Sequence, residues 1–401
     1  MALLAVEEAR ARILRGVRPL AAETVPLARA LGRVLARPVR AVRDQPPLDA
    51  SAMDGYAVLA GDLATTPVSL KVIGISAAGH GLVGTVRSGE TARIFTGAPV
   101  PKGADAVVIQ ENTAVQARPF VSVLHPVSAG QNIRPRGLDF RRGDVLLPRG
   151  IHLRPRDIGL AAAANQPELP VRRKPVVALF ATGDELVDPG GDPRGDQIVS
   201  SNSSALACLI RHFGAEVLNL GIIPDRLRRT ERAIHRACDA DILVTTGGAS
   251  VGDHDFMQEA LKNSGVRINF WKIALRPGKP LMYGRKGRQR ILGLPGNPVS
   301  ALVCARLFLK PLIDAMLGLA PGDDLVMARL GTAMKANDNR QDYVRAILTE
   351  APDGSRVAAP FARQDSSMQR TFREAHCLIM RPPLAPQAAE GDLVPILVLD
   401  F

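Results

Sequence analysis

The chain has 401 residues and a formal net charge of +12; 46% of its residues are hydrophobic and only 4% are aromatic. At roughly 100–200 residues per domain, this length predicts two to four domains. The shortage of aromatic residues and the lack of a long basic run or zinc-finger spacing disfavour nucleic acid as a partner, so the positive charge better fits small polyanions such as phosphates and oxyanions.

The N-terminal half of the chain predicts two short helices, a β-rich segment and then a third helix. Helices are expected at 6–15, ending at Gly16, and at 27–36, beginning after Pro26. Between about residues 44 and 148, short β-branched runs alternate with Gly, Pro and Asp clusters, which predicts a compact β unit. Its expected strands are 68–75, 91–95, 106–109, 120–124 and 145–147. A helix at 154–164 and a Pro/Arg-rich linker at 167–175 follow.

From residue 176 onward, apolar strands alternate with helices. This pattern predicts parallel βαβ units in a doubly wound sheet, and uninterrupted apolar strands fit a sheet covered on both faces. The expected strands are 176–181, 216–223, 242–246, 268–275 and 291–294; the expected helices are 203–213, 228–238, 256–263 and 298–317. After Gly318, strands are expected at 326–330, 344–348, 356–359, 377–380 and 393–399, which predicts a small C-terminal β-barrel or sandwich.

Cysteine and histidine usage disfavours a zinc, iron or CxxC redox centre, because no cysteines are closely spaced and the histidines are isolated. The N-terminus lacks the basic start and apolar core of a signal peptide. No run of about 18 uncharged apolar residues occurs. We therefore expect a cytoplasmic protein that does not span a membrane.

Polar residues concentrate where the predicted strands end, which is where open α/β sheets bind ligands. Gly247–Gly252 can bring consecutive backbone N–H groups close to a phosphate, although a plain turn is an alternative. Carboxylates follow three strands: Asp184, Glu185, Asp225, Asp253 and Asp255. Asp225 and Asp255 could also be helix N-caps. A magnesium ion would reconcile clustered carboxylates with an anionic ligand, while Arg276 and Lys279, after the strand expected at 268–275, would favour an oxyanion.

Seven motifs occur in one order along nearly the whole chain. They are SAMDGYA at 51–57, FTGAP at 95–99, GQNIR at 130–134 with GLD at 137–139, TGDEL at 182–186, TGGASVG at 246–252, RPGKP at 276–280 and LPGNP at 294–298. This series closely resembles the molybdopterin molybdenumtransferase (MoeA) family, which includes the C-terminal domain of gephyrin.

The resemblance implies a multidomain α/β plus β fold and an elongated homodimer. The implied parts are a discontinuous helical and extended domain at 1–44 and 137–174, a β-rich insert domain at 45–136, a doubly wound α/β molybdopterin-binding domain at 175–320 and a C-terminal β-barrel at 321–401.

The resemblance also implies a reaction and a set of site residues. The family joins molybdate to the dithiolene of adenylated molybdopterin and cleaves the pyrophosphate linkage, releasing AMP.

By motif, the pterin-phosphate end would bind Gly247, Gly248 and Ser250. Glu185, Asp225 and Asp255 would position Mg²⁺, the phosphates or the attacking water. Asp54 and Thr96 would reach the cleft from the other subunit, although Asp-Gly is also a common turn. Functionally important family positions are also matched by Asp139 and Lys272. The oxyanion pocket would consist of Arg276, Lys279, Ser300, Arg345 and Ser366.

Three other functions remain open at this stage. The adenylyltransferase that makes the preceding intermediate shares the Gly-Gly loop type, but it is a single α/β domain and would lack the segments around Asp54 and Asp139. A scaffold protein would not need Asp54, Glu185, Asp255 and Lys279. A paralogue specialised for tungstate is the third alternative. Other proteins of molybdenum-cofactor biosynthesis are further possible partners.

Overall fold

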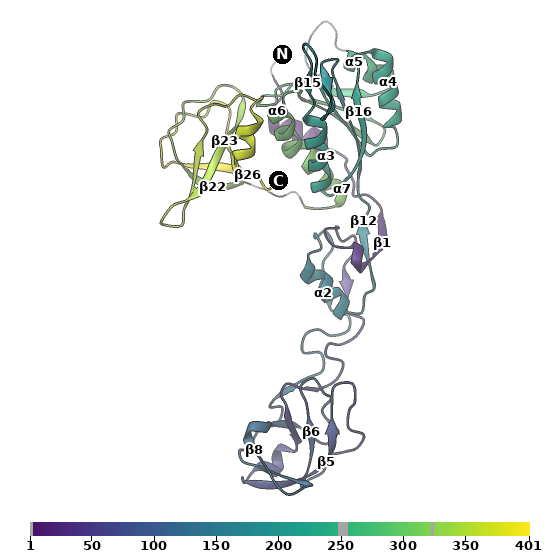
Figure 1. Cartoon of the computed structure of the whole chain (residues 1–401), viewed down its shortest axis with the longest axis vertical. Helices are drawn as coiled ribbons and strands as arrows, with labels where there is room; N and C mark the ends of the chain where they lie inside the picture. The colour runs from purple at the N-terminus through teal and green to yellow at the C-terminus, as the bar shows by residue number, and fades with distance from the viewer. Residues whose placement is uncertain (1–2, 248–255, 321, 323–324) are drawn as a thin grey trace. The chain divides into compact units, whose positions relative to one another are not determined.

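The computed structural model describes residues 3–247, 256–320, 322 and 325–401 (Figure 1). The chain divides into two compact units. The larger unit comprises Met1–Glu23, Gly32–Ala36 and Val171–Phe401, and the smaller unit comprises Thr24–Leu31 and Arg37–Pro170. The boundary between them falls within two strands, β1 (Ala22–Pro26) and β12 (Glu168–Arg172).

The smaller unit is built around a six-stranded sheet of order β7-β4-β6-β5-β9-β8. Its core consists of buried aliphatic residues such as Val58, Leu70 and Val108. The sheet strands are β4 (Gly55–Val58), β5 (Val68–Ser76), β6 (Glu90–Ile94), β7 (Ala106–Ile109), β8 (Thr113–Val115) and β9 (Phe120–Val123). Outside this sheet lie β2 (Val39–Arg40) with β11 (Val145–Leu147), β3 (Ala50–Ser51) with β10 (Ile133–Arg134), and α2 (Pro155–Ala163).

The larger unit contains the predicted doubly wound sheet, of order β16-β13-β17-β21-β20-β18. Within it, β13 (Val176–Thr182), β16 (Glu216–Ile223), β17 (Ile242–Thr246) and β21 (Gln289–Leu294) are parallel. The last two strands in this order are antiparallel to their neighbours: β20 (Met282–Lys286) to β21, and β18 (Arg267–Phe270) to β20.

Alternate residues of one strand enter two different cores, which explains why these strands are apolar throughout. Val177 and Leu179 of β13 pack in one core with α1 (Val6–Leu14), α3 (Asn202–His212) and the last helix. Ala178 and Phe180 pack in the other core with α4 (Leu227–Arg236) and α5 (Phe256–Asn263). The last helix runs through α6 (Pro298–Cys304), a π-helical segment (Ala305–Leu309) and α7 (Lys310–Leu317), ending at Gly318 with φ +76°.

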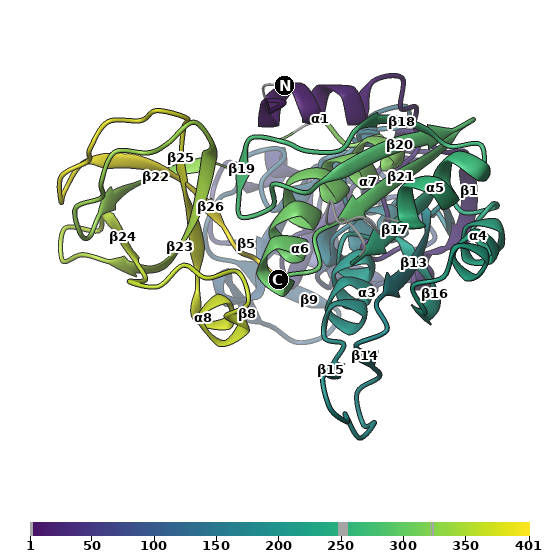
Figure 2. The same ribbon diagram turned by 90° about the horizontal axis from the view of Figure 1, so that it is seen from above.

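The C-terminal strands form a closed β-barrel, which confirms the predicted fold class. The order β23-β24-β22-β26-β25 is closed by pairing between β25 and β23 (Figure 2). The barrel strands are β22 (Leu325–Leu330), β23 (Gln341–Glu350), β24 (Arg356–Pro360), β25 (Cys377–Arg381) and β26 (Leu393–Val398), and α8 (Gln369–Glu374) lies between β24 and β25. Buried residues such as Leu330, Ala346 and Ile396 fill its core.

Three local predictions were wrong. The helix expected at 27–36 is only a 3-10 turn, Leu27–Arg29, because Gly32 with φ +73° follows and Leu35 forms a β-bridge with Val171. The linker expected at 167–175 contains strand β12. The single strand expected at 268–275 is two: β18 belongs to the α/β sheet, while β19 (Leu275–Arg276) pairs with β23 of the barrel.

Candidate functional site at the carboxyl edge of the α/β sheet

The predicted polar residues after β13 and β16 lie at one edge of the sheet, together with Gly247 after β17, because these three strands are parallel and end in register. Thr182 pairs with Ile223, and Ala181 pairs with Thr246. A pocket of about 370 Å³ opens there, lined by Thr182, Glu185, Asn202, Gly247 and Asn297 among others. This is the position at which open α/β sheets bind ligands.

Asn202, the first residue of α3, fixes the loops around this pocket. Its side-chain amide donates to Thr246 Oγ1 at 3.0 Å and to the Gly296 carbonyl at 2.7 Å. The Thr246 hydroxyl in turn donates to the Pro295 carbonyl at 3.1 Å. These bonds connect the ends of β17 and β21 to the start of α3, so the pocket wall is preorganised before any ligand arrives.

Two glycines at this edge are required by close packing. Gly247 has φ +86°, and an added Cβ would lie 2.3 Å from the Thr182 carbonyl oxygen. At Gly183 an added Cβ would lie 2.4 Å from Glu185 Oε2, because the carboxylate folds back over the glycine. Neither position accepts a side chain without movement, and at Gly247 the backbone itself forms the pocket wall.

Carboxylates from two strand ends meet beside the pocket. The Asp225 backbone N–H donates to Asp184 Oδ1 at 3.2 Å. Burial raises the pKa of Asp225, and the negative charges of Asp184 and Glu185 raise it further. Among the described residues, no Lys or Arg side chain forms an ion pair with Asp184, Glu185 or Asp225, so no neighbouring cation compensates the negative charge at this edge.

Several predicted residues lie outside the described part of the chain: Gly248, Ser250 and Asp255. Among the residues that the structure does describe, no group of three His, Cys, Asp or Glu side chains is close enough together to hold a metal ion. The predicted magnesium ligands Glu185 and Asp225 therefore supply at most a two-carboxylate site within these ranges.

The barrel contributes a loop to the pocket. The Asn297 side-chain amide donates to Ser366 Oγ at 2.7 Å, and the Gln369 amide donates to Ser201 Oγ at 2.8 Å. Ser300, on the first turns of α6, is only 4% exposed. Ser366 thus lies next to the LPGNP motif, which follows β21 of the α/β sheet.

Arg345 is buried in the barrel and binds this loop. Its Nε donates to Gln364 Oε1 at 3.1 Å and its Nη1 to the Asp365 carbonyl at 2.9 Å. Burial lowers its pKa. Arg345 as a whole is only 2% exposed. Through these hydrogen bonds it holds in place the segment that carries Ser366.

Arg276 and Lys279 do not follow a strand of the α/β sheet, which corrects their expected placement on its rim. Arg276 is in β19, beside the barrel. Its guanidinium pairs with Asp342 and Asp338, the latter at 3.0 Å. Lys279 is exposed, and its backbone carbonyl accepts from the Ile273 N–H at 3.0 Å. Lys272 is half-buried beside this segment.

In the smaller unit, Asp54 and Thr96 are in direct contact. The Thr96 backbone N–H and hydroxyl donate to Asp54 Oδ1 at 2.7 and 2.8 Å, and these hydrogen bonds lower the pKa of Asp54. Asp54 immediately precedes β4, where Gly55 is required because a Cβ would lie 1.8 Å from the Val108 carbonyl oxygen. Asp139 is exposed in the same unit.

Sequence reasoning missed the polar residues that shape the pocket without carrying charge. Asn202, Thr246 and Gln369 were not singled out, although Thr246 opens the TGGASVG motif and Asn202 follows a Ser-Ser pair at a helix start. The helix-start pattern could have identified Asn202; Gln369 belongs to a barrel helix that no periodicity indicated.

Comparison with known proteins covers the whole chain. Residues 4–165 match the MoeA N-terminal region (domain I and II), residues 178–315 a probable molybdopterin binding domain, and residues 327–399 the MoeA C-terminal region (domain IV). No helix in the described ranges has the length and apolarity needed to cross a membrane.

Named relatives agree with these matches. The molybdopterin molybdenumtransferase of Haemophilus influenzae is 33% identical over 98% of both chains, and that of Nostoc sp. is 39% identical over 81% of this chain and 77% of the relative. The crystal structure of the molybdopterin biosynthesis MoeA protein from Pyrococcus horikoshii superposes with a TM-score of 0.86 at 28% identity, covering 99% of each chain. The chain therefore belongs to the molybdopterin molybdenumtransferase family, the MoeA enzymes of molybdenum-cofactor biosynthesis.

Proposed function

We propose that this protein inserts molybdate into adenylated molybdopterin and cleaves the pyrophosphate linkage with Mg²⁺, releasing AMP. The observation that carries the proposal is the carboxyl-edge pocket. Gly247, which has no side chain, and Glu185 line this pocket, and the Asp225 carboxylate is close enough to Glu185 for the two negative charges to repel each other. An anionic phosphate ligand and a divalent cation together satisfy both features.

The phosphate end of the substrate would lie against Gly247, where no side chain keeps it from the backbone. Asn202 begins α3 and Pro298 begins the last helix, so two helix N-termini border the pocket. Helix N-termini favour negative charge. Gly248 and Ser250, next along the same motif, would continue this phosphate-binding wall.

The donor set fits magnesium. Mg²⁺ in phosphoryl-transfer sites is commonly held by one or two carboxylates, with substrate phosphates and water completing its coordination. Glu185 and Asp225, with Asp255 as a further ligand, would hold it here. When bound, Mg²⁺ neutralises phosphate charge and polarises the phosphorus that is attacked. The carboxylates then also orient the nucleophile.

The molybdate end would use the basic and hydroxyl residues near the barrel. Ser366 offers a hydroxyl group beside the pocket residue Asn297, and Lys279 offers an exposed ammonium group. Ser300 is buried two residues after Pro298, which lines the pocket. Arg345 would act through the loop that it holds, since its Nε and Nη1 groups donate hydrogen bonds to that loop. Arg276 would have to exchange its present carboxylate partners to reach an oxyanion. Lys272 and Asp139 complete the proposed set.

The proposal includes a homodimer with shared sites, in the cytoplasm, in which Asp54 and Thr96 reach the pocket of the other subunit. What supports it is their contact at an exposed position, which orients the Asp54 carboxylate without burying it. Mixing an inactive Asp54→Ala chain with an inactive Glu185→Ala chain tests this. Heterodimers should regain part of the activity, whereas no recovery after verified subunit exchange would rule out a shared site.

Incubating the purified protein with adenylated molybdopterin, molybdate and Mg²⁺ tests the reaction. AMP should appear together with molybdenum cofactor, and EDTA should stop both. Undiminished AMP release in EDTA would refute the magnesium assignment. Formation of adenylated molybdopterin from molybdopterin and ATP would instead support the adenylyltransferase function, and replacing molybdate by tungstate would measure oxyanion preference.

A further inference from the structure

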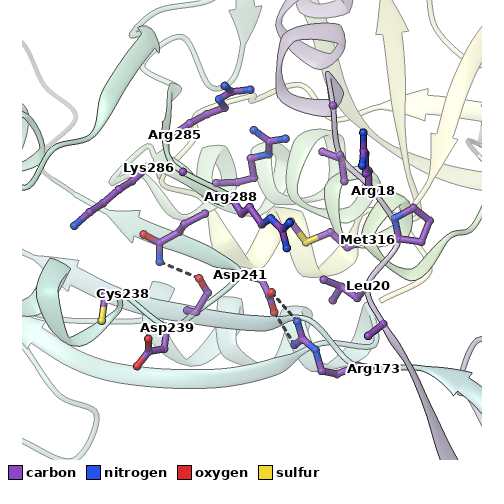
Figure 3. Close-up of a pocket in the computed structure, with 18 residues that line it drawn as sticks. Arg18, Leu20, Arg173, Cys238, Asp239, Asp241, Arg285, Lys286, Arg288 and Met316 are labelled. Atoms are coloured by element: carbon purple, nitrogen blue, oxygen red, sulfur yellow. Dashed lines mark hydrogen bonds and ion pairs between the residues drawn. The ribbon is translucent and has the colours of Figure 1, made fainter.

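A second pocket lies at the opposite, amino edge of the α/β sheet (Figure 3). It has a volume of about 860 Å³ and is lined by residues 16–21 after α1, residues 238–241 before β17, and the β20–β21 turn at 285–290. None of the residues proposed above for the molybdenum-insertion reaction lines it.

The lining is strongly basic. Its cations are Arg18, Arg173, Arg285, Lys286, Arg288 and Arg290, against the two carboxylates Asp239 and Asp241. Asp241 is already engaged: both of its oxygens accept from Arg173 at 2.8 Å, as the dashed lines in Figure 3 show. Within the described ranges, the side chains of Arg18, Arg285, Lys286 and Arg288 form no hydrogen bond or ion pair, and all four are exposed.

Arg290 is the buried member of this set. It is only 5% exposed, yet it forms no ion pair with any carboxylate of the described chain. One Nη donates to the Arg15 carbonyl at 3.2 Å, and Nε has no hydrogen-bond partner in the same ranges. A buried cation without a counter-charge is costly, and an anion in the adjoining pocket would compensate it.

The pocket also has an apolar part, formed by Val17, Leu20 and Met316. Figure 3 shows Leu20 and Met316 beside Arg18, while Arg285 and Arg288 come from the β20–β21 turn on the other side. The volume lies within the range of small-molecule sites, about 300–1,000 Å³. Guanidinium groups pair with phosphate oxygens through two parallel hydrogen bonds.

We propose that this amino-edge pocket binds an organic polyphosphate of nucleotide size, with its phosphates on Arg285, Arg288 and Arg290 and its ring on Leu20 and Met316. A concave pocket with a buried cation at its wall suits a small ligand that can enter it, whereas an acidic protein surface would reach only the exposed cations.

Isothermal titration calorimetry with ATP tests the proposal on the full-length protein. EDTA is included so that the carboxyl-edge carboxylates, without Mg²⁺, repel the phosphates. One site per chain is expected. The R285S/R288S variant should bind ATP at least tenfold more weakly, because charge-assisted hydrogen bonds are lost. The R329S/R356S variant removes two exposed cations from the barrel and should bind normally.

Further probes define the ligand. Tripolyphosphate should bind more weakly than ATP, because it has no ring to cover Leu20 and Met316; equal affinity would overturn the nucleotide assignment. Neither double variant should lose AMP release or thermal stability, since the four arginines are exposed. ATP affinity that is the same in R285S/R288S as in the wild type, or absence of ATP binding to the wild type, would overturn the site itself.

Discussion

The two edges of the α/β sheet carry opposite charge on the same strands. At the carboxyl edge, Asp184, Glu185 and Asp225 gather beside a pocket of about 370 Å³. At the amino edge, a pocket of about 860 Å³ is lined by six cations. β13 runs from one edge to the other, so its seven residues separate Arg173 of the basic pocket from Asp184 and Glu185 at the acidic edge.

This difference shows that the net charge of +12 is a poor guide to the chemistry of the site. The excess cations suggest an anion pocket, and the pocket at the amino edge is basic, but the charged residues of the family motifs at the carboxyl edge, Asp184 and Glu185, are acidic. A phosphate can bind there only with a cation beside it. The amino edge can bind a phosphate without one, because six cationic side chains line its pocket against two carboxylates.

Removing the Asp225 carboxylate should have the largest effect. Asp225→Asn should lower AMP release on the order of hundredfold, because it removes a proposed magnesium ligand. Burial and neighbouring carboxylates raise the pKa of Asp225, so its ionised form is less favourable in the folded than in the unfolded protein. That destabilisation is present above the folded-state pKa and disappears below the unfolded-state pKa. At pH 7 the variant should therefore melt at the same or a higher temperature.

Asp184→Asn is the matched control for Asp225→Asn, because it lies at the same edge but is not a proposed ligand. It should retain most activity, and by removing a negative neighbour it should lower the pKa of Asp225. The acid limb of the pH–activity profile should then move to lower pH. Equal loss of activity in both variants would show that the edge needs negative charge in general, not a ligand at Asp225.

A glycine comparison between the edges should show the next largest effect. Gly247 at the carboxyl edge and Gly265, beside the basic residues Arg267 and Arg285 at the other edge, have φ +86° and +80°. An added Cβ meets the Thr182 carbonyl oxygen at 2.3 Å in the first case and nothing within 4 Å in the second. Gly265→Ala should cost about 1–2 kcal/mol from its backbone conformation alone. Gly247→Ala should cost roughly 1–3 kcal/mol more, from overlap.

Urea unfolding measures both free energies. If the two alanine variants are equally stable, the close approach at Gly247 is relieved by a small shift of the strand end. AMP release by the two variants then shows whether such a shift affects the site. Gly265→Ala should turn over normally, whereas Gly247→Ala should lose phosphate binding because the backbone at residue 247, which forms the pocket wall, is displaced.

Variants of Arg276 test whether this cation takes part in the site at the carboxyl edge or only stabilises the barrel. In the structure it binds Asp338 and Asp342, and burial raises the pKa of Asp342 despite this partner. Arg276→Ala should cost about 1–2 kcal/mol, less than a fully buried pair because Arg276 is 45% exposed. The loss should be largest at neutral pH and should shrink as pH falls through the raised folded-state pKa of Asp342.

Arg276→Lys keeps the charge and should recover part of this stability. Titrating molybdate separates the stabilising role from substrate binding. A half-saturating molybdate concentration that rises roughly tenfold or more in Arg276→Ala, with Arg276→Lys near normal, would place the side chain in the oxyanion pocket. An unchanged concentration would leave Lys279 as the basic candidate in that loop.

The sequence predicts the strands, and the sheet edge at which they end, better than it predicts which distant residues pair with each other. The apolar runs of β13 and β17 lie where their pattern places them, and so do the polar residues that follow β13 and β16. The segment at 268–275 fails because Leu275 and Arg276 pair with a barrel strand, and the partners of Arg276 are more than sixty residues away in the chain. The local hydrophobic pattern of a segment cannot predict pairing with residues that are distant in the chain.

Roles of site residues depend on the same long-range contacts. Arg345 was expected in an oxyanion pocket, yet most of its described hydrogen bonds go to a loop about twenty residues later. The amino-edge pocket was not predicted either, because its cations come from three separate segments. Composition indicated an excess of arginine, but only the fold brings Arg18 and Arg288 to one pocket.

The smallest expected effect concerns Asp241, the engaged carboxylate of the amino edge. Its ion pair with Arg173 is partly exposed, and it raises the pKa of Arg173. Asp241→Asn keeps an oxygen that can accept from the Val176 N–H, as Asp241 Oδ2 does now at 2.8 Å. It should therefore lower the free energy of unfolding in urea by only about 0.5–1 kcal/mol.

Asp241→Asn also frees the Arg173 guanidinium, so ATP in EDTA should bind about two- to fivefold more tightly, since 1.4 kcal/mol corresponds to tenfold. Loss of one carboxylate would thus improve phosphate binding at this edge, while Asp225→Asn lowers turnover at the other. Weaker ATP binding in Asp241→Asn would mean that Arg173 must be held by Asp241 to shape the pocket, and that the amino edge depends on its acid as much as the carboxyl edge does.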